Sequence, residues 1–102
     1  MARFDTIIHQ PVRLQIMAAL TALPDEAQME FVTLRKTLGL TDGNLSVHLR
    51  KLEDAGYVAV EKTFVGRKPR TFIAATPEGR KAFDEHVLAL QAIIQRTEPD
   101  AL

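Results

Sequence analysis

The stretch GNLSVHLRKLEDAGYV, residues 43–58, combines an apolar stripe with a polar face that could bind another molecule. Its leucines recur at i, i+4 and i+7, the spacing of a helix face packed on a core. The opposite face carries small, hydrogen-bonding and basic side chains, namely Asn44, Ser46, Val47, Arg50 and Lys51. Such a face either is solvated or recognises a partner that offers hydrogen-bond acceptors and negative charge.

A second group of cations follows a short distance along the chain. The segment GRKPR places Arg67, Lys68 and Arg70 close together, where Gly66 and Pro69 favour a turn. Repulsion between these cations has no structural benefit, so the turn is either a solubilising loop or a binding element for a polyanion. Two basic elements in one small domain favour the polyanion.

Patterns for catalysis and metal binding are absent from the sequence. There are no cysteines, and the three histidines, His9, His48 and His86, fall on different predicted elements. No Ser-His-Asp arrangement, phosphate-binding glycine loop or HExxH motif occurs. The sequence therefore predicts neither an enzyme nor a cofactor.

The composition predicts one small globular domain, residues 1–102, with 46% hydrophobic and 25% charged residues. No apolar run approaches the roughly 20 residues of a membrane span, and the first residues lack the apolar core of a signal peptide. We therefore expect a cytoplasmic protein. The formal net charge is zero, but residues 33–72 hold eight cations against four anions, so the middle of the chain is basic.

Periodicity and capping residues predict the elements that position these groups. Helices are expected at 10–23, at 34–39 with Thr33 as N-cap, at 42–55 with Thr41 as N-cap, and at 77–96 with Thr76 as N-cap. Phe31 could pair briefly as a strand. After Gly56 the period becomes two, which predicts a β-hairpin whose basic tip spans 64–71.

This order of elements is that of a winged helix-turn-helix, a mainly α fold with a β-hairpin. In that arrangement the 42–55 helix enters the DNA major groove. Arg50 and Lys51 suit guanine acceptors or phosphates, Asn44 suits adenine, and Val47 suits the thymine methyl group. The basic hairpin would reach the minor groove or flanking phosphates.

Three motifs resemble a known group of proteins. LSVHLRKLEDAGYV, residues 45–58, is similar to the pattern VSxHLxxLxxAGLV of ArsR-like regulators, and HQPVRLQIMAAL, residues 9–20, resembles their first helix. ATPEGR, residues 75–80, resembles the entry to the last helix of MarR-like regulators. The chain thus resembles winged-helix transcriptional regulators of the MarR-like/ArsR-like group over residues 7–95.

The resemblance implies contacts with double-stranded DNA. Thr33 and Arg35 would touch phosphate, and His48 matches a family histidine that is either packed or DNA-contacting. The DNA-binding residues expected from the helix, the hairpin and the resemblance together are Thr33, Arg35, Asn44, Ser46, Val47, His48, Arg50, Lys51, Arg67, Lys68 and Arg70.

Members of this group also sense metals and small molecules. Asp84 and His86 resemble half of a family zinc site, but Thr97 stands where the other half should bring a histidine, so we expect no metal. An effector pocket built from ordinary apolar residues would look like packing, so an effector stays open.

The 77–96 helix has more apolar surface than a small domain usually covers alone. We expect it to form a twofold homodimer that reads a pseudo-palindromic DNA site, with burial inside a monomer as the alternative. The predicted interface residues are Ile7, Ile8, Phe83, His86, Val87, Leu90, Ile93 and Ile94.

The predicted function is sequence-specific binding of double-stranded DNA by a dimeric transcriptional regulator, acting as a repressor. Two alternatives stay open. One is a winged-helix module that binds protein or RNA, although such modules usually have a neutral or acidic groove helix. The other is an effector-sensing regulator with a ligand at the dimer interface.

Overall fold

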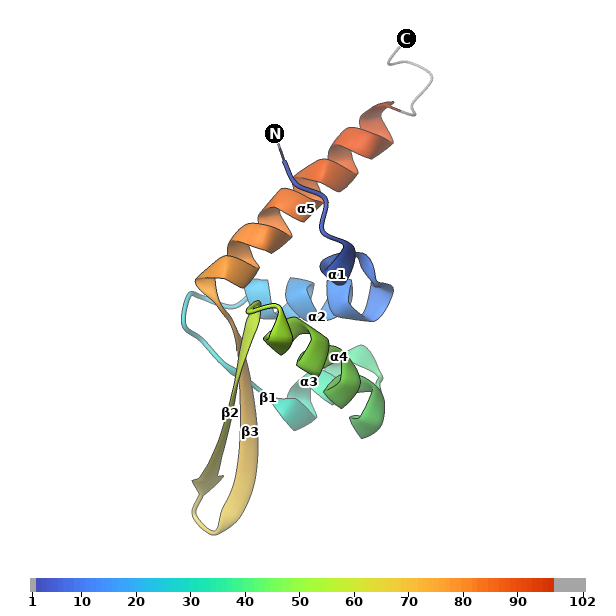
Figure 1. Ribbon diagram of the computed structural model, residues 1–102. Helices are drawn as coiled ribbons and strands as arrows, with labels where there is room; N and C mark the ends of the chain where they lie inside the picture. Colours follow the sequence, from blue (N-terminus) through green and yellow to red (C-terminus); the bar gives the residue numbers. More distant parts are fainter. Residues whose placement is uncertain (1, 97–102) are drawn as a thin grey trace.

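The structure, a computed structural model, describes residues 2–96 of the chain. The described elements, labelled in Figure 1, are α1 Thr6–His9, α2 Pro11–Thr21, β1 Met29–Glu30, α3 Phe31–Leu38, α4 Asp42–Asp54, β2 Val58–Val65, β3 Lys68–Ala75 and α5 Pro77–Arg96. This order confirms the predicted winged helix-turn-helix, a mainly helical fold with a β-hairpin. Within residues 2–96, no helix is long and apolar enough to cross a membrane.

The turn between α3 and α4 is set by its own residues. Gly39 ends α3 with φ of 65°, a left-handed conformation that glycine adopts without a steric penalty. Thr41 then caps α4, because its side chain accepts a hydrogen bond from the Asn44 backbone N–H over 3.1 Å. The predicted end of the first helix at Gly39 and the predicted N-cap at Thr41 are therefore both present, and they define the short turn between α3 and α4.

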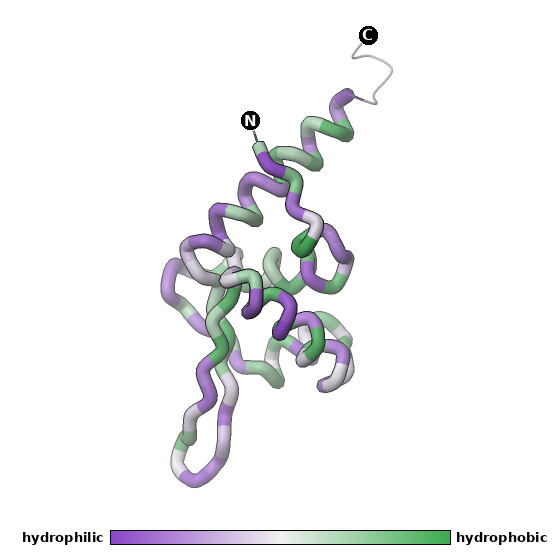
Figure 2. Tube along the Cα trace, in the orientation of Figure 1, coloured by the Kyte–Doolittle hydropathy of each residue, from purple (hydrophilic) through white to green (hydrophobic). Residues whose placement is uncertain are grey.

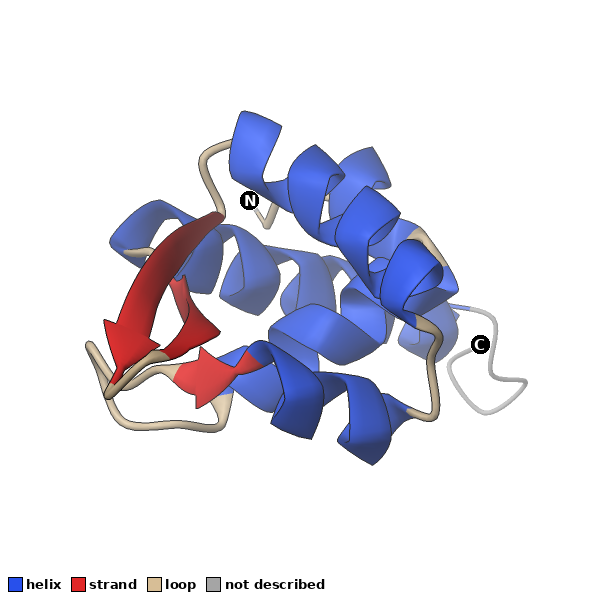
Figure 3. Cartoon of the chain, turned by 90° about the horizontal axis from the view of Figure 1, so that it is seen from below, coloured by secondary structure: helices blue, strands red, loops and turns tan. Residues whose placement is uncertain are grey.

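The sheet has three antiparallel strands in the order β1-β3-β2. β2 and β3 pair from Val58 opposite Ala75 to Val65 opposite Lys68, and Gly66 and Arg67 form the two-residue turn. Gly66 has φ of 66°, which suits the first position of a tight hairpin turn. Figure 1 shows the hairpin extending away from the helices, and Figure 3 shows the strands at one side of them.

The core lies where α2, α3, α4 and the base of the hairpin meet, and α1 closes one side. Figure 2 shows hydrophobic and hydrophilic residues alternating along the helices that enclose it. Leu45, Leu49 and Leu52 are buried as predicted, and Leu34 of α3 is buried with them, whereas Leu38 is only partly buried. The other buried hydrophobic residues of this cluster are Ile8, Ile16, Met17, Leu20, Val58, Ile73 and Ala75.

The helix predicted at 10–23 is present as α2, Pro11–Thr21, but α1 in front of it was not predicted. α1 is a separate short helix, because Asp5 caps it by accepting hydrogen bonds from the Ile7 and Ile8 backbone N–H groups. Gln10 adopts ψ of 131°, which interrupts the helix, and its side chain caps Arg13 at the start of α2. Two successive capping side chains therefore divide the segment.

Two further predictions near α3 are wrong. Thr33 is not the N-cap, because α3 begins at Phe31 after Glu30, and no side chain caps it. The short strand is Met29–Glu30, paired with Ile73 and Phe72 of β3, so Phe31 is already helical. Pairing with β3 holds Met29 and Glu30 extended. The helix α3 begins directly after this strand, at Phe31, which is earlier in the chain than the predicted start at residue 34.

Thr76 joins α5 to the end of α4. As predicted, it caps α5: its hydroxyl accepts a hydrogen bond from the Gly79 N–H over 2.9 Å. The same hydroxyl donates to the Gly56 carbonyl over 2.6 Å, and the Thr76 N–H donates to the Tyr57 carbonyl over 3.1 Å. Beyond this joint, α5 runs past the rest of the domain in the direction opposite to the hairpin (Figure 1).

Candidate nucleic-acid interface

The outward face of α4 is built as the sequence predicts. Leu45, Leu49 and Leu52 are buried and fix the rotation of the helix about its axis. The five side chains that the sequence singled out on the other face are all exposed: Asn44, Ser46, Val47, Arg50 and Lys51. The fold therefore presents amide, hydroxyl, methyl and cationic groups together on one helix, the set needed to read base edges and phosphates.

His48 lies between the core and the surface. It is half-buried, and its Nδ1 lies 3.1 Å from the Arg13 guanidinium, which can only donate, so Nδ1 is the acceptor. Burial, followed by the Arg13 charge, lowers the pKa of His48, so the imidazole is neutral at neutral pH. Two roles were open for His48 from the sequence, packed or DNA-contacting, and this contact favours the packed one.

Thr33 and Arg35 occupy the first turns of α3. Thr33 is exposed, as a phosphate contact requires. Arg35 Nε lies 2.9 Å from the Asp42 carboxylate at the start of α4, so this cation links the two helices. A phosphate contact by Arg35 would share its guanidinium with Asp42.

The three predicted cations of the hairpin divide into two kinds. Arg67 and Lys68 are exposed at the tip. Arg70 instead forms an ion pair with Glu30 over 2.6 Å, which joins β3 to the N-terminal end of α3. Part of the charge of Arg70 is thereby neutralised, which singles out Arg67 and Lys68 as the cations most available to a polyanion.

A cleft of about 330 Å³ separates α4 from the hairpin, and sequence reasoning did not identify its basic wall. Ser46 and Arg50 line one side, and Lys62 and Thr71 of the hairpin line the other. Lys62 lies two residues after Val60 on the strand face that begins in the core at Val58. The pattern that could have identified this wall is Lys62 itself, a cation that continues the apolar row of Val58 and Val60.

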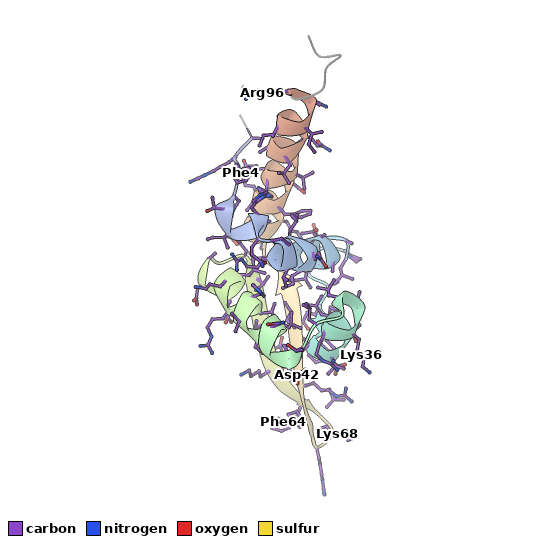
Figure 4. All side chains as sticks on the ribbon, turned by 90° about the vertical axis from the view of Figure 1, so that its right-hand side faces the viewer. Phe4, Lys36, Asp42, Phe64, Lys68 and Arg96 are labelled. Atoms are coloured by element: carbon purple, nitrogen blue, oxygen red, sulfur yellow. The ribbon has the colours of Figure 1, made fainter. Side chains whose placement is uncertain are left out.

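These groups gather at one end of the molecule. Figure 4 places Asp42 at the start of α4, Lys36 on α3, and Phe64 and Lys68 on the hairpin in the half of the chain away from Phe4 and Arg96. α3, α4 and the hairpin can therefore face one ligand together. The exposed cations of α4 and the hairpin suit a polyanion.

The predicted interface residues on α5 and α1 lie at the other end. Two of them are corrections: Ile8 and His86 are completely buried inside the chain, so neither is available to a partner. Phe83, Val87 and Leu90 are half-buried, whereas Ile7, Ile93 and Ile94 are exposed. The apolar face of α5 thus docks on the domain in its first half and continues beyond it.

His86 is buried for a reason that the sequence does not reveal. Its Nδ1 accepts a hydrogen bond from the Asp5 N–H over 2.9 Å, and its ring lies 4.7 Å from that of Phe4 and 5.4 Å from that of His9. Asp84, the other half of the motif that resembles a zinc site, is exposed. Residues 2–96 contain no group of three or more histidine and carboxylate side chains that could hold a metal ion.

The fold and its basic, exposed helix and hairpin define a DNA-binding protein of the winged helix-turn-helix class. Residues 12–94 match the family described as a winged helix DNA-binding domain, and the chain belongs to that family. This assignment confirms the predicted class and agrees with the prediction that the chain is not an enzyme.

Three proteins illustrate the similarity. An uncharacterised protein of Methanocaldococcus jannaschii is 36% identical over 92 residues, which cover 90% of this chain and 97% of that protein. A transcriptional regulator homologue from Pyrococcus horikoshii OT3 is 34% identical with a TM-score of 0.83, covering 92% of this chain and 90% of that one. A MarR family regulator from Silicibacter pomeroyi is 21% identical with a TM-score of 0.61, covering 93% of this chain and 64% of that one, and shares the fold.

The chain is therefore a winged helix DNA-binding protein that is similar to a transcriptional regulator homologue. The MarR-like and ArsR-like parts of the resemblance stay predictions.

Proposed function

We propose that the chain is a homodimeric repressor that binds a pseudo-palindromic DNA site. α4 lies in the major groove, and the tip of the hairpin lies on the minor groove or flanking phosphates. One observation carries the proposal: the exposed polar face of α4 and the basic hairpin meet at one end, and the uncovered apolar face of α5 lies at the other (Figure 4).

Within this proposal each residue class has its own task. Asn44, Ser46, Val47 and Arg50 read base edges, because they project from the exposed face of α4, from its first turn to its middle, and such a helix fits the major groove. The phosphate contacts come from Thr33, Lys51, Arg67 and Lys68, with smaller contributions from Arg35 and Arg70, which already have carboxylate partners.

A second copy of this chain covers the end of α5. Ile93 is 46% exposed on a face that is buried one turn earlier at Ala89, so the helix keeps its apolar pattern after the domain has ended. Val87, Leu90 and Ile94 lie beside it. An isologous pair of such helices would bury this face and place two copies of α4 on one side of the DNA.

Repression follows from size and geometry. A dimer of 11.4 kDa chains that lies across a promoter blocks access to it by occupancy alone. All of residues 1–102 act as one domain in this proposal, with the 77–96 helix as the dimerisation element.

The proposal is tested by fluorescence anisotropy of the full chain on labelled duplex from its own upstream region, at low and physiological salt, with random duplex as competitor. We expect binding that resists the competitor and weakens as salt rises. Arg50→Ala should lose about 1–3 kcal/mol and discriminate less between bases, whereas Lys81→Ala, which removes an exposed cation on α5, serves as the matched control.

Other outcomes separate the alternatives. Binding to RNA or to a protein partner, with none to duplex at low salt, would replace the proposal with an interaction module. Duplex binding that changes only when a small molecule is added would favour the effector-sensing regulator.

A further inference from the structure

The tip of the hairpin exposes two large apolar side chains. Phe64 is 71% exposed and Val65 is 57% exposed, and both directly precede the Gly66–Arg67 turn. Phe64 has the largest exposed fraction among the large hydrophobic side chains of residues 2–96. Adjacent apolar side chains at the end of a protruding hairpin gain nothing from the fold, so a partner must supply their burial.

The strand register fixes the face on which Phe64 lies. Residues directly opposite in an antiparallel pair share a face, and Phe64 is opposite Pro69. Alternation places Phe64 in the row that begins at the buried Val58 and continues through Lys62. Lys62 lines the cleft beside α4, so Phe64 continues the side of the hairpin that faces α4.

The surroundings of Phe64 identify the chemistry of the partner. Residues 58–75 carry four cations, Lys62, Arg67, Lys68 and Arg70, and a single anion, Glu61. An apolar tip with positive neighbours suits a partner with dense negative charge outside and apolar surface within. The minor groove of duplex DNA has this construction, because its phosphates flank apolar sugars and stacked base pairs.

We propose that Phe64 is an apolar wedge that enters the minor groove beside the turn and partly unstacks a base step. This inference rests on the proposed binding of duplex DNA. Arg67 and Lys68 hold the hairpin on the phosphates, while Phe64 adds a contact that carries no charge. The unstacking bends the duplex and favours steps that deform easily, so the hairpin contributes to sequence preference without base hydrogen bonds.

The test compares the full chain with Phe64→Ala, Phe64→Leu and Thr63→Ala. Thr63→Ala is the matched control, because it truncates the neighbouring side chain on the other face of the strand. The probe is the duplex footprinted by the wild type, with 2-aminopurine at the step under the hairpin. Thermal unfolding by circular dichroism confirms that each variant keeps its fold, which the exposure of Phe64 leads us to expect.

We expect Phe64→Ala to bind at least tenfold more weakly with an unchanged dependence on salt, because no charge is removed. Wild type should raise the 2-aminopurine fluorescence, Phe64→Leu should retain part of the increase, and Thr63→Ala should behave like wild type. Phe64→Ala binding within twofold of wild type, or a loss without any wild-type fluorescence increase, overturns the wedge and leaves the proposed function standing. Failure of the wild type to bind duplex overturns both.

Discussion

The Tyr57 hydroxyl donates a hydrogen bond to Asp5 Oδ2 over 2.5 Å, which ties the segment before α1 to the turn between α4 and β2. The other oxygen of this carboxylate caps α1, and the Asp5 N–H donates to His86 of α5. Asp5 thus connects α1, the end of α4 and α5. Three parts of the chain that are distant in the sequence are joined through one residue, by its side chain and its backbone N–H.

Tyr57→Phe should lower the free energy of unfolding by about 1–3 kcal/mol, because the Asp5 carboxylate loses a charged hydrogen bond. Urea unfolding measures the change. The hydrogen bond to Asp5 is the main cause that raises the pKa of Tyr57 from its usual 10 to about 12. A raised pKa stabilises the fold below pH 10 and loses that contribution between pH 10 and 12, so the wild type should lose its advantage over Tyr57→Phe in that range. An advantage that stays constant would contradict this.

His86 should make the fold sensitive to acid. Burial is the main cause that lowers its pKa, and His9 lowers it further, whereas Asp5 opposes them. A lowered histidine pKa gives a contribution that is complete above pH 6.5 and is lost as pH falls below it. His86→Asn, which can still accept from the Asp5 N–H, should cost about 0.5–3 kcal/mol at neutral pH and flatten the acid limb of the unfolding profile. Parallel acid limbs for wild type and His86→Asn would rule this out.

Gly79 and Gly43 should respond differently to alanine. A Cβ at Gly79 would overlap the Tyr57 carbonyl oxygen, so Gly79→Ala must displace backbone and should cost about 3 kcal/mol or more. Gly43 has open space around it within α4, so Gly43→Ala should be neutral or stabilise by up to about 1 kcal/mol. Urea midpoints distinguish the two, and an equal effect at both glycines would show that the junction of α4 and α5 can yield.

Arg67 and Arg70 should contribute unequally to the salt dependence of DNA binding. Arg67→Ala should lower the slope of log affinity against log salt by about 1, because it removes a cation at the tip. Arg70→Ala should change the slope less and destabilise the fold instead, since it breaks the pair with Glu30. Glu30→Gln releases Arg70 from that pair and should raise the slope. Equal slopes for the two arginine variants would refute the distinction.

Ile93→Asp should convert a dimer to monomers and weaken operator binding, because it places a charge in the proposed interface. Leu88→Asp is the matched control: Leu88 is also exposed on α5, but it lies about 140° around the helix from Ile93. Analytical ultracentrifugation reports the oligomeric state. If both variants stay dimeric, the interface lies elsewhere.

The sequence predicted the elements whose signals are local. The leucine spacing of α4, the caps Thr41 and Thr76 and the alternation of the hairpin each depend on a few neighbouring residues, and the structure contains all of them. The additional helix α1 was not predicted, because it depends on Asp5 and Gln10, whose side chains can cap only once the backbone turns there. A capping residue within an apolar pattern does not reveal whether the backbone turns at that residue or continues as a helix through it.

Interactions between distant residues limited the prediction of the site. Arg35, Arg70 and His48 are basic or polar side chains at expected positions, but their partners Asp42, Glu30 and Arg13 become visible only in the fold. The burial of Ile8 and His86 has the same origin, because α1 and the residues before it cover the start of α5. Composition and spacing identify candidates, and tertiary contacts decide which of them face outward.

The joint at Thr76 has a consequence for the length of the DNA site. Two hydrogen bonds from Thr76, to the Gly56 and Tyr57 carbonyls, hold the beginning of α5 against the turn that follows α4, so in a dimer joined through α5 the position of each α4 relative to the twofold axis is fixed. One base pair added at the centre of a palindrome moves the outer half by about 3.4 Å and turns it by about 35°. A dimer in which each α4 is held rigidly against α5 cannot follow this combined shift and rotation. Only one of its two α4 helices would then contact its half-site in such an operator.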